Sequence, residues 1–271
     1  MIHPTVTPDL WVIFLCAQVG MRPDQRLVDM VVARIEKVLH NLVGPEQVRG
    51  RPAWRVPAWF TYTQSRGLVF DAPDGDKVHV DVEVKTARGT APRGMWHDQG
   101  RGDGPNRGGA VILMLPVGWL WDADAVEGTL THELTHAIDP DLHRRKHRPS
   151  SYTLTEQGGV REQDAGAYAN DPAEIRAVMS NIQRRLHSKR VRELVSLWST
   201  KGFPWSPGRL PTTALLAQTL LEEDSEMARI GRFLTPANRS MIKRMAEQEV
   251  QDVLHDLGTR RVARRWIQAR G

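Results

Sequence analysis

The chain has 271 residues, of which 40% are apolar and 25% charged, the composition of an ordinary globular protein with room for one large domain or two small ones. Its only cysteine, Cys16, excludes an intrachain disulfide and a cysteine-rich zinc module. The net charge of +5 is compatible with anionic partners but does not require them, and no run of residues approaches the roughly 18 apolar residues of a membrane span.

The first apolar segment, LWVIFLCAQVG at residues 10–20, has some features of a secretory signal. Its apolar part is short, and the residues before it include Asp9 but no lysine or arginine, which is the wrong charge for a signal peptide. The pattern instead predicts the start of a buried strand or helix. We therefore expect a cytoplasmic protein, or one exported without a classical signal peptide.

The next segments predict a helix followed by strands. Residues 22–44 carry apolar side chains at helical spacing. Residues 66–72 and 77–86 are predicted strands separated by a DGDK turn, and valines alternate with polar residues in the second. Residues 88–109, rich in Gly, Pro, Arg and Asp, predict a long loop, whereas residues 109–117 form a continuous apolar run typical of a strand buried on both faces.

From residue 123 onward the pattern is mostly helical. Helices are expected over residues 123–139, 172–199, 212–233 and 236–270. Strands followed by helices predict an α+β fold with a small mixed sheet. We expect one compact unit made of a helix and sheet subdomain, residues 1–122, and a helical subdomain, residues 123–271, with a cleft between them.

The stretch GTLTHELTHAIDP, residues 128–140, contains His132, Glu133 and His136. In a helix, residues four apart project only about 40° apart, so the two imidazoles point toward one place. This is the spacing for two nitrogen ligands of one Zn²⁺ ion. Glu133 projects about 60° from His136 and could take a proton from a water molecule whose pKa the metal lowers. Because both histidines must be neutral to bind, activity is expected to fall in acid.

The residues around this stretch favour a buried helix over a surface helix whose histidines are merely polar. Asp122 or Asp124 can cap the start of the helix, and Pro140 ends it. The residues expected to face the core are Ala125, Val126, Leu130, Leu134 and Ile138.

The six residues HELTHA at 132–137 resemble the active helix of the zincin metallopeptidases. The resemblance covers this helix and one downstream helix rather than the whole chain. It implies a zincin-like fold, one zinc ion and the hydrolysis of peptide bonds in a protein or peptide substrate. It also implies that the preceding strand, 109–116, is the edge strand along which the substrate lies, with the 88–109 loop at the rim of the cleft.

A catalytic zinc site needs a third protein ligand. Residues 139 and 142 do not fit the metzincin pattern, and the glutamate-type zincins take this ligand from a downstream helix. Glu174, in the stretch NDPAEIRA and 38 positions after His136, has a spacing similar to that of lethal-factor-like peptidases, so the resemblance implies Glu174. An acid in the first turn of a helix also favours the helix dipole without any metal. The rivals that stay open are Asp139, His143, Glu156 and Glu162.

Such a site also needs a hydrogen-bond donor that stabilises the negative charge developing on the carbonyl oxygen of the substrate when water attacks it, the oxyanion. Tyr168 falls close to the position of a tyrosine in lethal-factor-like enzymes, which implies this role, although ordinary packing explains it equally well; Tyr152 is a weaker alternative. The thermolysin-like group has an aspartate where this chain has Val178. The hydrogen-bond partner of His132 is therefore expected elsewhere, with Glu162, Asp164 or a backbone carbonyl as candidates.

Two alternatives to a peptidase follow from the same sequence. One is a catalytically inactive binding or structural module that keeps a zincin fold. The other is a basic nucleic-acid-associated protein, suggested by the net charge and by the basic helix expected at residues 258–271, although a solvated helix face explains that segment better. The Gly- and Arg-rich stretch at residues 100–109 is expected to be a solvated loop. The sequence does not indicate an oligomeric state.

Overall fold

The computed structural model describes the chain over residues 22–99, 106–140, 164–187, 213–223 and 225–268. Several expectations therefore lie outside the described residues: those for the 10–20 segment and for Tyr152, His143, Glu156 and Glu162. The chain divides into two compact units, residues 1–180 and residues 181–271. The expected boundary at residue 122 rested on secondary structure alone and stays a prediction.

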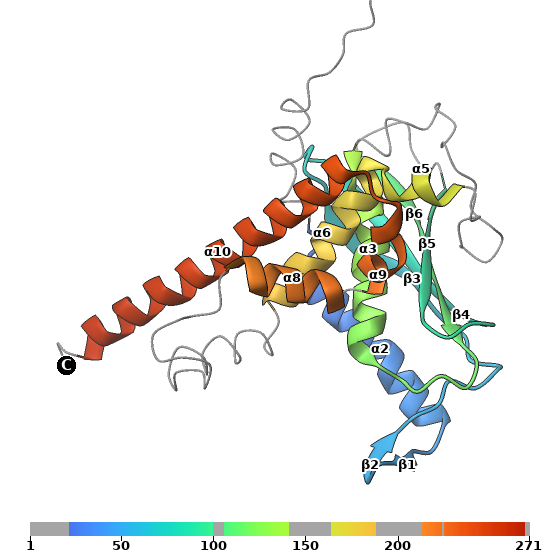
Figure 1. Ribbon diagram of the computed structural model, residues 1–271. Coiled ribbons are helices and arrows are strands. Elements are labelled where there is room, and N and C mark those ends of the chain that lie inside the picture. Colours follow the sequence, from blue (N-terminus) through green and yellow to red (C-terminus); the bar gives the residue numbers. More distant parts are fainter. Residues whose placement is uncertain (1–21, 100–105, 141–163, 188–212, 224, 269–271) are drawn as a thin grey trace, which may run out of the picture. The chain divides into compact units, whose positions relative to one another are not determined.

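A four-stranded mixed sheet forms the β part of the first unit (Figure 1). Its strands are β3 (Tyr62–Asp71), β4 (Lys77–Ala87), β5 (Arg93–Asp98) and β6 (Asn106–Pro116). They lie in the order β3-β4-β6-β5, and β4 and β6 are parallel while the two outer pairs are antiparallel. Together with the helices described below, this sheet confirms the predicted α+β class.

The prediction for the edge strand is wrong. Strand β6, expected at the edge as residues 109–116, lies between β4 and β5, and its long apolar run suits a strand with neighbours on both sides. The edge strand beside β6 is β5, which falls inside the segment 88–109 expected to be a loop. A short strand containing Arg93, Gly94 and Asp98 has the weak apolar signal that is common at sheet edges.

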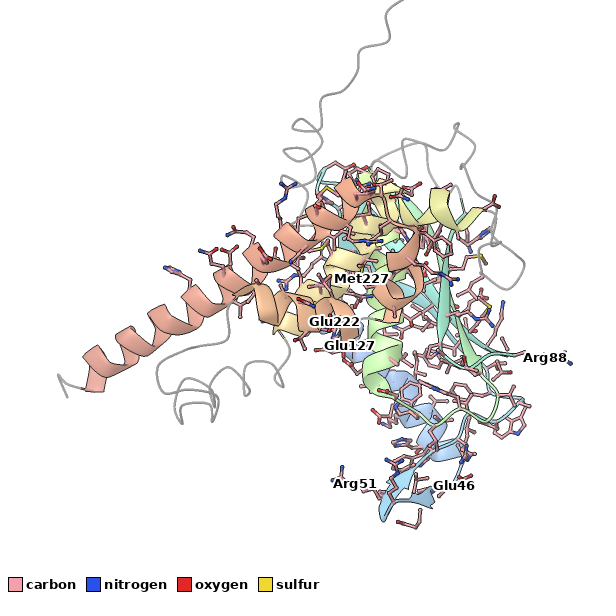
Figure 2. All side chains as sticks on the ribbon, in the orientation of Figure 1. Glu46, Arg51, Arg88, Glu127, Glu222 and Met227 are labelled. Atoms are coloured by element: carbon pink, nitrogen blue, oxygen red, sulfur yellow. The ribbon has the colours of Figure 1, made fainter. Side chains whose placement is uncertain are left out.

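A small hairpin of β1 (Glu46–Val48) and β2 (Arg51–Ala53) precedes the sheet. Arg49 and Gly50 form its turn, and both have a positive φ, as a two-residue turn with the twist of a hairpin requires. Figure 2 shows Glu46 and Arg51 on the two strands of this hairpin.

The helices of the first unit are α2 (Gln25–Leu42), α3 (Ala123–Ile138), α5 (Ala165–Ala169) and the first half of α6 (Pro172–His187). Helix α2 confirms the helix predicted over 22–44, and the Asp24 side chain caps it by accepting from the N–H of Arg26. One hydrophobic core joins α2, α3 and the sheet. Its largest members include Ile35, Leu39, Phe60, Leu68, Phe70, Leu113, Leu115, Leu130 and Leu134.

The second unit is helical, with α8 (Thr213–Glu223), α9 (Ser225–Ile230), the 3₁₀ turn η2 (Gly231–Phe233) and α10 (Pro236–Gln268). Thr235 caps α10, since its hydroxyl accepts from the N–H of Asn238, and Pro236 occupies the first helical position. The expected C-terminal helix is confirmed as the end of α10. None of the helices in the described ranges combines the length and the apolar character that crossing a membrane requires.

Candidate metal centre

Helix α3 places the HELTH stretch in the interior of the first unit. The Asp122 carboxylate caps the helix by accepting from the N–H groups of Asp124 and Ala125, and the helix ends at Ile138, before Pro140. Four of the five residues expected to face the core do so: Val126, Leu130, Leu134 and Ile138. Ala125, the fifth, is only half-buried. This packing fixes which face of α3 carries the histidines.

The structure brings three of the predicted site residues together. Nε2 of His132 lies 3.2 Å from Oε2 of Glu174, Nε2 of His136 lies 3.4 Å from Oε1 of Glu174, and the two Nε2 atoms are 3.2 Å apart. The two imidazole rings are nearly perpendicular, at 85°. All three residues are buried, and they could hold a metal ion.

Local sequence explains how Glu174 reaches the histidines. The Asp171 carboxylate accepts from the N–H of Ala173 and so caps α6, whose first helical residue is Pro172. Glu174 therefore falls in the first turn of α6, and Figure 1 shows this end of α6 beside α3. The candidate ligands come from one helix and from the start of the next described long helix.

The donor atoms lie close enough together to bind one metal ion. Donors at 2.0–2.1 Å from Zn²⁺ in a tetrahedron are about 3.3–3.4 Å from one another. The two Nε2 atoms are 3.2 Å apart, and each lies 3.2 or 3.4 Å from a different oxygen of Glu174. One ligand atom from each of the three residues lies within 4.8 Å of the other two. Three lone pairs in such close contact repel one another unless a proton or a cation lies between them. The donor set of two imidazoles and one carboxylate therefore fits a metal such as zinc.

Without a metal, protons compensate part of the negative charge in this cluster. Burial by itself would raise the pKa of Glu174, but the charge of His136 and hydrogen bonds from both histidines hold this pKa well below its usual value of 4.5. Burial by itself would lower the pKa of His136, but the charge of Glu174 and its hydrogen bond raise this pKa above 6.5. The metal-free site therefore favours a carboxylate beside an imidazolium.

Glu133 lies beside these three residues and is also buried. Burial raises its pKa above 4.5, and the charge of Glu174 adds to this, while the two histidines and a hydrogen bond from the Trp96 backbone act in the opposite direction. The Glu133 side chain reaches β5, where a Cβ at Gly94 would lie only 2.3 Å from Cγ of Glu133. A glycine at position 94 is thus required for Glu133 to occupy this place.

The sequence analysis missed the contribution of β5. Gly94 and Trp96 fall in the RGMWHD stretch, whose glycine and charges resemble a loop. A Gly followed by a Met-Trp pair inside such a stretch is the available signal, because glycine in a strand often marks the close approach of another group.

The remaining predicted residues are placed as follows. Asp139 is not among the residues that converge; its carboxylate accepts from the guanidinium of Arg176 instead. Tyr168 is buried in α5, and its role at an oxyanion stays a prediction. Asp164 lies at the start of α5. Nδ1 of His136 is buried without a hydrogen-bond partner in the described part of the chain.

Comparison of the chain with protein-family models, with curated proteins and with solved structures finds no match in any of the three. The function is therefore inferred from the fold and from the geometry of this buried cluster.

Proposed function

We propose that this chain is a zinc-dependent metallopeptidase of the zincin type. The observation that carries the proposal is the meeting of His132, His136 and Glu174 in one buried cluster, with the carboxylate of Glu133 beside them. Two histidines and one glutamate are a donor set of catalytic zinc, which keeps one position for water or substrate. A structural zinc site would use four protein ligands and would not need Glu133.

Zinc bound by these residues would supply a Lewis acid that lowers the pKa of water and polarises a carbonyl group. Glu133 is suited to accept the proton that the attacking water loses. Its raised pKa brings the carboxylate closer to the operating pH, and the N–H of Trp96 holds it in one orientation. The same carboxyl group can then deliver the proton to the amine that leaves when the peptide bond breaks.

Strand β5 offers a place for an extended peptide. Gln99 donates its N–H to the carbonyl of Gly108, and the register continues through the pair Asp98 and Gly109. Because bonded and non-bonded pairs alternate in an antiparallel ladder, the backbone groups of Gly94, Trp96 and Asp98 face away from β6. The hydrogen bond from Trp96 to Glu133 agrees with this direction.

No strand in the described part of the chain pairs with this outer edge of β5. A substrate in extended conformation could add to it as a further strand, with main-chain hydrogen bonds to groups of this edge other than the Trp96 N–H, which donates to Glu133. Such binding would bring a peptide carbonyl close to the metal centre and to Glu133. The substrate class is therefore a protein or peptide, and its side-chain preference is not part of the proposal.

The proposal is tested with the purified full chain, a generic unfolded protein such as casein, and zinc analysis. We expect one zinc ion per chain and cleavage that a chelator stops and added zinc restores. Glu133→Gln should keep the zinc and lose about a hundredfold or more of the cleavage rate, the typical contribution of a general base. Zinc without cleavage in the wild type would favour an inactive zincin-fold module, and no zinc at all would reject the metal centre.

A further inference from the structure

A buried ion pair joins the two segments that carry the candidate ligands. Nε of Arg176 donates to Oδ2 of Asp139 at 2.9 Å, and Nη2 donates to the same oxygen. Asp139 is 1% exposed and Arg176 is 4% exposed. Such a pair has little contact with water, so its charges are screened by one another rather than by solvent.

Each member of the ion pair is close in sequence to a candidate ligand. Asp139 is the residue that ends α3, three positions after His136, and Arg176 follows Glu174 by two positions in α6. Two residues of rotation amount to about 200° around a helix, so Glu174 and Arg176 leave α6 on nearly opposite sides. Both nevertheless reach α3 or its C-terminal cap.

This arrangement holds α6 from two directions. A rotation of α6 that withdrew Glu174 from the histidines would pull Arg176 away from Asp139 and break this buried ion pair, which is costly. A shift of α6 along its axis would have the same effect. The ion pair therefore adds a fixed point, besides the packing of α6, for the setting of Glu174 relative to α3.

Helix electrostatics do not explain the two charges. The C-terminal end of a helix favours cations, yet Asp139 is an acid at the end of α3. The N-terminal end favours anions, yet Arg176 is a base near the start of α6. A buried pair is also weak support for stability in comparison with apolar side chains of similar size. What the pair does provide is a single register between the two helices.

We propose that Asp139 and Arg176 are positioning residues that hold Glu174 in place to bind a divalent cation together with His132 and His136. This inference rests on the proposed function, since it concerns the same metal centre. It assigns Asp139 a role other than that of a ligand. It also predicts that removing the pair weakens metal binding in protein that is still folded.

The experiment measures zinc affinity by competition with a chelator, and the visible spectrum of the Co²⁺-substituted protein, for the wild type and for the variants Asp139→Asn and Arg176→Met. We expect the affinity for zinc to fall about 10- to 100-fold, as is typical when a residue that orients a metal ligand is lost. We also expect the cobalt spectrum to move toward that of Glu174→Ala. Urea unfolding without metal gives the folded fraction for each variant.

Arg107 provides a matched control. It is also 4% exposed and also pairs with carboxylates, those of Asp74 and Asp76, in the same unit but in the sheet. Arg107→Met should lower the stability of the metal-free protein and leave the zinc affinity and the cobalt spectrum of the folded protein unchanged. If the loss of any buried charge pair weakened metal binding, Arg107→Met would lower the zinc affinity as Asp139→Asn and Arg176→Met do.

A double variant, Asp139→Leu with Arg176→Leu, covers the case in which a single substitution prevents folding, because it removes both charges of this ion pair together. We expect it to fold and still to bind zinc weakly. If the folded variants bind zinc and cobalt as the wild type does, the positioning role is rejected and the metal centre stands. If the wild type itself binds neither ion, the metal centre is rejected, and the positioning role with it.

Discussion

The side chain of Glu133 occupies the space that a side chain at position 94 would need. A Cβ on Gly94 would lie 2.3 Å from Cγ, 2.8 Å from Oε1 and 2.9 Å from Cδ of Glu133. Distances this short do not occur between real side chains, so one of the two groups would have to move. Because Glu133 is on a core helix and Gly94 on a strand paired along its whole length with β6, the Glu133 side chain is the part free to rotate.

Gly94→Ala should therefore act on Glu133 without touching the three candidate ligands. We expect cleavage to fall about a hundredfold or more, close to the loss in Glu133→Gln, because a displaced base no longer reaches the water molecule. The zinc content should stay at one ion per chain. The loss should appear in kcat, with KM for the substrate changed much less.

Gly44→Ala is the matched control for this substitution, since nothing lies within 4 Å of a Cβ built at Gly44. It should leave both cleavage and zinc content as in the wild type. Full activity in Gly94→Ala would show that Glu133 does not work from the position described here. Loss of zinc together with activity would instead mean that β5 supports the metal ligands themselves.

Replacement of one ligand at a time tests whether Glu174 belongs to the metal centre. Glu174→Gln keeps the size of the side chain but removes the negative charge, and an amide oxygen is a poorer donor to zinc. We expect its zinc affinity to fall by more than the roughly 10- to 100-fold expected for a partner that only orients a ligand. His132→Ala and His136→Ala should do the same in a chelator competition. If Glu174→Gln bound zinc with unchanged affinity, the third ligand would have to be another residue.

The metal-free protein should be most stable between about pH 4.5 and pH 6.5. The pKa of Glu174 is lowered, so its stabilisation is present above 4.5 and is lost as the pH falls through its folded value. The pKa of His136 is raised, so its stabilisation is complete below 6.5 and is lost as the pH rises through its folded value. Glu133 moves the maximum toward the lower end of this range, because its folded pKa is raised and its deprotonation disfavours the folded state as the pH rises above 4.5.

Urea unfolding in the presence of EDTA, at pH values on either side of 6.5, measures this dependence. Glu174→Gln removes the charge that raises the pKa of His136, so its stability should fall less steeply above pH 6.5 than that of the wild type. With zinc present the direction reverses, because the metal displaces the proton from His136 and its affinity increases as the pH rises. Equal slopes in the wild type and in Glu174→Gln would contradict the charge interaction between the two residues.

Local sequence predicts only one part of the cluster. His132, Glu133 and His136 share one helix, and the spacing of four residues alone aims both imidazoles at one place. Glu174 depends on how α6 lies against α3, which no local pattern shows, and only the resemblance to glutamate-type zincins pointed to it. The 3.2 Å contact between His132 and Glu174 therefore follows from the tertiary fold and not from local sequence.

Strand β5 and the pair of Asp139 with Arg176 were missed for related reasons. A short edge strand takes its stability from its partner β6 rather than from its own apolar pattern, so the RGMWHD stretch resembles a loop. Arg176 is 37 positions from Asp139, and an arginine in a helical segment is normally solvated. Its burial follows from the burial of α6, where every residue from Ala173 to Ser180 is buried.

Proline substitutions in β5 can test whether its outer edge binds the substrate. The N–H of Asp98 faces away from β6, whereas the N–H of His97 faces β6 and belongs to the ladder. Proline has no N–H, and an edge strand tolerates it only where that N–H is not needed by the sheet. Asp98→Pro is compared with Asp98→Ala, which loses the same side chain but keeps the N–H. Both should fold and bind zinc, and Asp98→Pro should cleave protein substrates several-fold to tenfold more slowly than Asp98→Ala, with the change mainly in KM.

His97→Pro is the matched control, because it removes a hydrogen bond within the sheet instead of one offered to the substrate. It should lower the free energy of unfolding by about 1 kcal/mol or more, the net value of one hydrogen bond together with the strain of the ring. Its effect on KM should be smaller than that of Asp98→Pro wherever both proteins are folded. If Asp98→Pro cleaves casein with the KM of Asp98→Ala, the outer edge of β5 does not hold the substrate by main-chain hydrogen bonds, and the peptide must approach Glu133 from another direction.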